Sequence, residues 1–168
     1  MNNNRTYPAD STANHPDATD GEWSYEPDDD GTMPDNVAEL ANLVVGKRIV
    51  SAETRKWETK PDPDTYQWTT SGEGLVLTLN DGTAFALEDS SDCCAYTDLE
   101  AFVYHPAKVD NIITAVETEG GYTKWHVLAD GSDVLELTVG WSCGNPFYYG
   151  YGFDFRVVEV VADGEVEP

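Results

Sequence analysis

Basic residues are scarce in this sequence. Nine lysines and arginines stand against 32 aspartates and glutamates, which gives a formal net charge of -23. A surface of that sign repels nucleic-acid backbones and the anionic cytoplasmic leaflet of membranes. The composition therefore argues against direct binding of nucleic acid or of a membrane surface. It fits a surface that attracts basic patches, one that attracts cations, or one that attracts no partner at all.

Long apolar runs and cysteines are also few. No stretch approaches the roughly 18–20 apolar residues of a membrane span, and residues 1–8 lack the apolar core of a secretion signal. Of the three cysteines, Cys93 and Cys94 are adjacent, which strains a disulfide between them. A bridge from Cys143 to either of them would leave one thiol over. We therefore expect reduced cysteines and a cytoplasmic protein.

The residues that are present divide the chain into three parts. Residues 1–35 hold nine acidic residues and one basic residue, without helical or strand periodicity, which is typical of a disordered tail. Residues 163–168 form a second acidic tail. Between them, residues 36–162 are expected to form a single β-rich domain with a net charge of -12.

One short helix is predicted at the start of this domain. Asp35 and Asn36 offer an N-cap, and Gly46 marks the end of the helix. The apolar residues between them recur at helical spacing and predict a stripe that covers one end of a sheet: Val37, Leu40, Leu43 and Val44.

The apolar period changes to two after Lys47, which predicts strands. Asn80, Asp81 and Gly82 form a hairpin turn between two alternating runs, and residues 130–133 form another. Short strands separated by turns favour a mostly β fold, an antiparallel meander that closes into a small barrel or sandwich. The predicted strands are residues 49–57, 75–79, 83–87, 95–103, 112–118, 123–129, 134–141 and 152–161.

Three ordered motifs give the sequence a family resemblance. They are GKRIVSAE at residues 46–53, GLVLTLNDGT at 74–83 and DCC at 92–94. Together they resemble a family of small proteins of unknown function from actinobacteria and their phages, in which a GK-IVSVE strand precedes an LTLDDGT hairpin and a DCCE-like segment. Ala95 stands here in place of the last glutamate. Over residues 45–160 the resemblance implies a small β-rich fold and a phage or mobile-element origin, and it implies no reaction.

The cysteines and histidines are the candidate metal ligands. Thiolate and imidazole groups suit zinc, but neighbouring residues of a strand point to opposite faces and no Cys-x-x-Cys pair occurs. Buried free cysteines also pack as small hydrophobic residues. We therefore expect no metal and no cofactor, and keep a metal-supported or cysteine-dependent enzyme as an alternative. Its candidate residues are Cys93, Cys94, His105, His126 and Cys143.

Aromatic residues supply the candidate protein contacts. Two lie in the acidic tail, and three lie in a glycine-rich stretch, where rigid amphipathic rings are typical of binding loops. Partial burial in the domain itself is the alternative. The predicted contact residues are Trp23, Tyr25, Tyr148, Tyr149 and Tyr151.

These observations favour a non-enzymatic interaction protein. The function we predict is that of a phage accessory protein that binds a host or phage protein through acidic and aromatic surface. A more specific version is DNA mimicry, in which carboxylates occupy the basic groove of a nucleic-acid-binding protein. Besides the enzyme, a further alternative is that the acidity reflects adaptation to high salt. The oligomeric state is left open.

Overall fold

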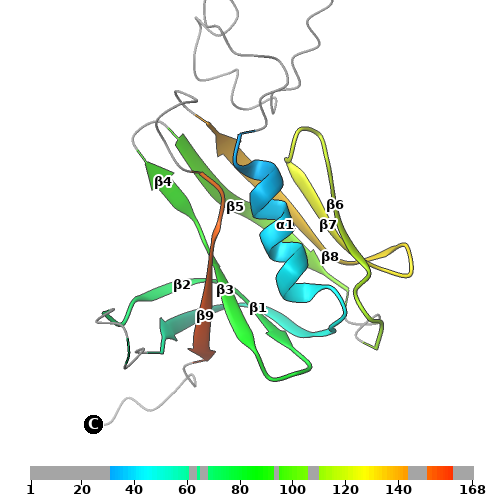
Figure 1. Ribbon diagram of the computed structural model, residues 1–168, viewed down its shortest axis with the longest axis horizontal. Helices are drawn as coiled ribbons and strands as arrows, with labels where there is room; N and C mark the ends of the chain where they lie inside the picture. Colours follow the sequence, from blue (N-terminus) through cyan, green and yellow to red (C-terminus); the bar gives the residue numbers. More distant parts are fainter. Residues whose placement is uncertain are drawn as a thin grey trace, which may run out of the picture.

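Two antiparallel sheets and one helix make up the part of the chain that the computed structural model describes, residues 31–60, 64, 68–92, 95–105, 110–143 and 151–160 (Figure 1). The protein is thus a small, mostly β, sandwich-like domain, which confirms the predicted fold class. Its elements are α1 (Met33–Val44), β1 (Ile49–Thr59), β2 (Ser71–Leu79), β3 (Ala84–Glu88), β4 (Ser90–Asp92), β5 (Ala95–Tyr104), β6 (Ala115–Glu119), β7 (Lys124–Ala129), β8 (Ser132–Ser142) and β9 (Asp154–Val160).

The first sheet closes on itself as a four-stranded barrel in the order β1-β2-β3-β9. Its centre is the predicted β2–β3 hairpin, in which Leu75 pairs with Leu87 and Leu77 with Phe85. Gly82 has a φ of 86°, as the turn requires, so this hairpin is confirmed. β9 closes the barrel because it pairs with β3 on one side and with the end of β1 on the other.

The second sheet has the order β4-β5-β8-β7-β6. The turn between β7 and β8 contains Asp130 and Gly131, with φ values of 51° and 72°. Positive φ at both positions suits a two-residue hairpin turn, and the predicted turn is confirmed. β5 carries a bulge between Leu99 and Ala101, which bends the strand at the place where it faces the first sheet.

The main core joins both sheets and the helix. Met33, Leu40 and Val44 line the buried face of α1, and Figure 1 shows the helix running along the second sheet. Trp125 and Trp141 of the second sheet belong to the same cluster. The four strands of the first sheet also form a second small cluster, to which β1 gives Trp57, β2 gives Val76, β3 gives Ala84 and Ala86, and β9 gives Val158.

The helix begins earlier than the sequence predicts. Thr32 occupies the N-cap position, Met33 is fully buried, and a proline lies in the first turn. The prediction that Asp35 and Asn36 cap the helix is therefore wrong, because Pro34 has the fixed φ that suits a first turn and Asn36 is used elsewhere in the fold.

The strand predicted over residues 112–118 is also displaced. β6 begins at Ala115, and the residues before it connect to the turn after α1. The amide of Gly46 donates to the carbonyl of Ile113 at 2.9 Å, and the amide of Ile113 donates to the carbonyl of Lys47 at 2.8 Å. The side chain of Ile113 is buried. These bonds occupy the backbone that would otherwise extend β6.

Candidate functional site

Residues 151–153, which precede β9, are held by polar side chains from the start of the helix. The hydroxyl of Thr32 donates to the carbonyl of Tyr151. The side chain of Asn36 donates to the carbonyl of Phe153 at 2.8 Å and accepts from the amide of Phe153 at 2.9 Å. Asn36 therefore satisfies both backbone groups of a buried residue, which explains why a polar side chain lies on the buried face of α1.

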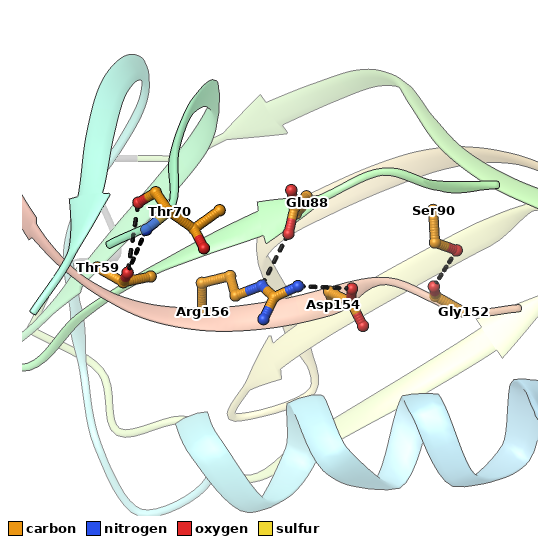
Figure 2. Close-up of polar contacts among 7 residues, drawn as sticks. All are labelled: Thr59, Thr70, Glu88, Ser90, Gly152, Asp154 and Arg156. Carbon is orange, nitrogen blue, oxygen red and sulfur yellow. Dashed lines mark hydrogen bonds and ion pairs between the residues drawn. The ribbon is translucent and has the colours of Figure 1, made fainter. Parts of the chain in front are cut away.

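Gly152 is held from the other side. Its amide donates to the hydroxyl of Thr97 at 2.8 Å, and its carbonyl accepts from the hydroxyl of Ser90 (Figure 2). The φ of Gly152 is 117°, and a Cβ at this position would lie 2.7 Å from Cγ of Asn36. Only glycine fits here. We call the hydrogen bonds that hold residues 151–153 the anchor of the aromatic stretch.

Tyr151 belongs to the core, which corrects one predicted contact residue. Its side chain is only 7% exposed and stacks on Trp141 with the ring centroids 5.7 Å apart. The prediction of a surface contact is wrong for Tyr151 because the anchor turns this end of the stretch inward. The other predicted contact residues lie outside the described residues: Trp23, Tyr25, Tyr148 and Tyr149.

The predicted ligands that the structure describes are not gathered in one place: Cys143, His105 and His126. Cys143 is buried in the main core, whereas His126 alternates with the core residues Trp125 and Val127 and so points to the opposite face of the second sheet. His105 pairs with Glu136, which lies on that opposite face as well. Cys93 and Cys94 lie outside the described residues. Within the described ranges, no group of three or more His, Cys, Asp or Glu side chains could hold a metal ion.

His126 instead forms a polar cluster with carboxylates. Its Nδ1 lies 2.8 Å from Asp133 and its Nε2 lies 3.4 Å from Glu119. Burial of the ring acts to lower the pKa of His126, but hydrogen bonds and charge attraction from the two carboxylates outweigh it and raise the pKa above its usual value. The imidazolium form is therefore favoured.

A cleft of about 540 Å³ lies between the two sheets and is the best candidate binding site. Its volume falls in the range of about 300–1,000 Å³ that is typical of ligand pockets. One wall comes from β1, β2 and β3 and the other from β5. The lining residues are Thr54, Trp57, Gly72, Glu73, Gly74, Leu75, Leu87, Glu88, Asp89, Leu99, Glu100, Ala101 and Phe102.

The charge of this cleft is of one sign. Among the described residues, its lining includes four carboxylates and no lysine, arginine or histidine. Glu88 is the one lining carboxylate that pairs with a base in the described part of the chain, since Nε of Arg156 donates to it at 2.7 Å (Figure 2). In the described part of the chain, no ion pair joins a basic side chain to Glu73, Asp89 or Glu100. The cleft therefore favours a cationic ligand.

Two carboxylates beside the cleft repel each other. Asp89 accepts a hydrogen bond from the amide of Leu99 at 2.8 Å, and Asp98 is the residue before Leu99 on β5. Burial, together with the charge of Asp89, raises the pKa of Asp98 above its ordinary value. A bound cation would relieve this repulsion.

The floor of the cleft holds an unused hydrogen-bond donor. Trp57 is only 2% exposed, and its Nε1 has no hydrogen-bond partner in the described structure. The indole ring lies across Gly72, where a Cβ would be 2.5 Å from Cζ2, and Nε1 lies 3.9 Å from the place of a Gly74 Cβ. Gly72 thus makes room for the ring itself, and Gly74 places no side chain beside Nε1. A buried donor without a partner costs free energy, and an acceptor on a ligand would recover it.

The domain matches one known protein family model. The family model described as a domain of unknown function, DUF7448, matches residues 42–155. The chain belongs to the DUF7448 family. No curated protein and no solved structure matches it. The predicted membership of an uncharacterised family is confirmed to this extent.

The DUF7448 match contains the whole cleft but not the whole fold. It begins within α1, after Asn36 and Leu40, and ends within β9, before Val158 and Val160. The missing ends supply the anchor of Phe153 and the pairing of β9 with β1. The structural domain therefore extends beyond the DUF7448 boundaries at both ends. Among the described residues, no helix has the length and apolar character needed to span a membrane.

Sequence reasoning missed the residues that build the cleft. Trp57 reads as the end of an alternating strand, and Gly72 and Gly74 read as a loop before the hairpin. Glycine inside a strand often marks a place where another group comes close, and at Gly72 that group is the indole ring of Trp57. Trp68, which is 91% exposed near the same end of the first sheet, was also missed. It was missed because a single tryptophan in a polar stretch carries no periodicity.

Proposed function

We propose that this protein is a non-enzymatic binding module that holds a basic segment of a partner protein. The observation that carries the proposal is the cleft between the two sheets, whose described charged lining residues are acidic. The net charge of -23 supports it, because a negative field speeds the approach of basic partners. The exposed indole of Trp68 supports it as well, since tryptophan is enriched where proteins make contact.

The arrangement of the described cysteine and histidines favours binding over catalysis. A cysteine hydrolase needs a thiolate within hydrogen-bond reach of a base. Cys143 lies on the core face of the second sheet, and His126 lies on the other face and is engaged by Asp133 and Glu119. These two side chains form no catalytic pair.

The setting of this function is the cytoplasm of a bacterial host cell, with the protein acting as a phage accessory factor. The resemblance of the motifs at residues 46–53 and 74–83 to actinobacterial and phage proteins supports this origin. The partner is then a host or phage protein with a basic surface.

Affinity purification of the tagged full chain tests this proposal. Lysates of an actinobacterial host, treated with nuclease, are passed over the protein at 50 mM and 1 M NaCl, and retained proteins are identified and purified. We expect a stoichiometric basic partner that rebinds in purified form and is released by salt. A purified partner whose binding is indifferent to salt, or the absence of any stoichiometric partner, would contradict the proposal. If the partner binds DNA and duplex DNA displaces it, the binding is DNA mimicry.

A further inference from the structure

One wall of the cleft is an open strand edge. β2 pairs with β1 over the whole stretch from Leu79 to Ser71, but its pairing with β3 stops at Leu75. Within the described residues, residues 71–74 therefore have a strand on one side only. Backbone groups of alternate residues in an edge strand point outward without a ladder partner. Four residues offer about 13 Å of such an edge.

The opposite wall is a second open edge. β5 pairs with β8 on one side, while on the other side its pairing with β4 covers, within the described residues, Ala95 to Thr97 only. Beyond Thr97, the amide of Leu99 bonds to the side chain of Asp89 instead of to a strand. The cleft thus lies where the chain passes from the first sheet to the second. It is bounded by two strand edges that have no strand partner among the described residues.

The floor between these edges has two glycines, and the indole ring of Trp57 fills the space that a side chain at Gly72 would take. Beside Gly74, Nε1 of Trp57 lies 3.9 Å from the place of a Cβ and has no acceptor among the described residues. Peptide carbonyls are the acceptors that an extended segment presents along its whole length. A peptide carbonyl above Gly74 would be close to the indole N–H.

The charge selects among extended segments. Glu73, Asp89 and Glu100 surround the cleft, and the two tails of this chain are themselves acidic. Like charge therefore disfavours the protein's own tails as occupants. It also disfavours a second copy paired edge to edge, because Glu73 of each copy would lie in the shared interface. A segment with lysine or arginine at alternate positions matches the carboxylates.

We propose that this cleft receives an extended, lysine- or arginine-containing segment of the partner protein, which pairs with residues 71–74 of β2 and accepts a hydrogen bond from Nε1 of Trp57. This inference rests on the proposed binding function and adds its site and mode. The mode is addition of a strand to an open sheet edge, in which main-chain bonds give affinity and alternate side chains give specificity.

The probe is a fluorescein-labelled octapeptide of alternating lysine and valine, added to the full chain. Fluorescence anisotropy measures its binding, and ¹H–¹⁵N NMR follows the indole N–H resonances, with that of Trp57 assigned from Trp57→Phe. We expect the Trp57 resonance to move on binding. The resonances of Trp125 and Trp141 should stay in place, because their Nε1 atoms already donate to the carbonyls of Tyr122 and Gly121.

Peptide controls separate charge from backbone pairing. A peptide of alternating glutamate and valine should not bind. The lysine peptide with alternate backbone amides methylated should bind at least about ten-fold more weakly, because it loses ladder bonds but keeps its charge. Equal binding of the methylated peptide would overturn strand pairing.

Variants of the protein locate the site. Glu73→Gln combined with Glu100→Gln should weaken the lysine peptide about three- to ten-fold. Glu117→Gln combined with Glu119→Gln removes the same charge from the far edge, β6, and should change the affinity less than two-fold. Gly74→Ala, whose Cβ would lie 3.2 Å from the carbonyl oxygen of Leu87, narrows the cleft beside the indole. Gly74→Ala should therefore weaken binding of the lysine peptide, and it tests the site even if Trp57→Phe does not fold.

The outcomes distinguish this inference from the function on which it rests. If the purified partner binds but the cleft variants bind it as tightly as the unchanged protein, the site is elsewhere and only the inference fails. If the peptide binds while the Trp57 resonance stays in place, the inference fails in the same way. If sedimentation shows that the protein pairs with itself through the variants' site, a second copy is the occupant and the inference is wrong.

Discussion

Asn36 shows how one polar side chain can connect distant parts of a β-rich fold. It is 7% exposed, lies on the buried face of α1 and forms both of its hydrogen bonds with Phe153. Apolar replacement at this position would leave a buried N–H and a buried C=O without partners. The penalty for such groups is larger than the gain from an ordinary hydrogen bond.

Asn36→Ala should therefore lower the free energy of unfolding by about 1–3 kcal/mol for each backbone group that it leaves unpaired. Asn42 lies exposed on the same helix, so Asn42→Ala is the matched control and should change stability by less than about 0.5 kcal/mol. Urea unfolding followed by tryptophan fluorescence measures both. Equal stability of the two variants would show that the bonds to Phe153 contribute nothing.

His126 makes stability depend on pH at the residue scale. Its pKa in the folded protein is raised by Asp133 and Glu119, although burial of the ring opposes the shift. A raised folded pKa gives stabilisation that is fully present below the unfolded pKa of about 6.5 and is lost as pH rises through the folded pKa.

His126→Gln should accordingly reduce stability more at pH 5.5 than at pH 9, with a difference below about 1 kcal/mol because the pairs are partly exposed. Thermal unfolding at the two pH values measures it. His105→Gln provides the same substitution elsewhere on the sheet. A loss for His126→Gln that is the same at both pH values would mean that the ring acts through packing and not through charge.

At the scale of elements, the β2–β3 turn is tied to the start of β1. Nζ of Lys47 lies 2.9 Å from Asp81, and Asp81 also accepts from the amide of Thr83 at 2.9 Å. The hydrogen bond from Lys47, followed by that from Thr83, lowers the pKa of Asp81 to about 2. The stabilisation from this contact is present above the unfolded pKa of 3.8 and is lost as pH falls toward 2.

Lys47→Met should raise the pKa of Asp81 toward, but not fully to, 3.8, because the bond from Thr83 remains. NMR titration of the side-chain carboxyl carbons measures this pKa. Lys60→Met removes a similar pair, with Glu159 at 2.9 Å, and should leave Asp81 unchanged. A pKa of Asp81 that stays near 2 in Lys47→Met would assign the whole effect to the turn itself.

Elements that depend on neighbours in the sequence were predictable, and elements that depend on distant partners were not. The hairpin around Gly82 was predicted because its turn and alternation lie within a few residues. The roles of Asn36 and Trp57 could not be predicted, because their partners lie 117 residues away or are glycines on another strand. The cleft escaped prediction for the same reason, since it exists only where two sheets meet.

For the whole molecule, the net charge of -23 predicts that salt stabilises the fold. Repulsion among like charges weakens a compact state, and dissolved ions screen it. The melting temperature should rise between 10 and 150 mM NaCl and level off by about 1 M, where the Debye length is about 3 Å. Differential scanning calorimetry measures it, and sucrose at matched osmolality is the control. A protein that unfolds below molar salt would instead support adaptation to a saline environment.

The closure of the first sheet by β9 has a consequence for synthesis. Val160 pairs with Trp57, and Phe155 pairs with Leu87, so the barrel cannot close before residue 160 has left the ribosome. Until then the outer edge of β3 and the end of β1 lack the strand that pairs with them in the folded protein. Contacts of such long sequence separation fold slowly and leave nascent strands open to wrong partners. A chain that repels its copies through charge is protected during that interval.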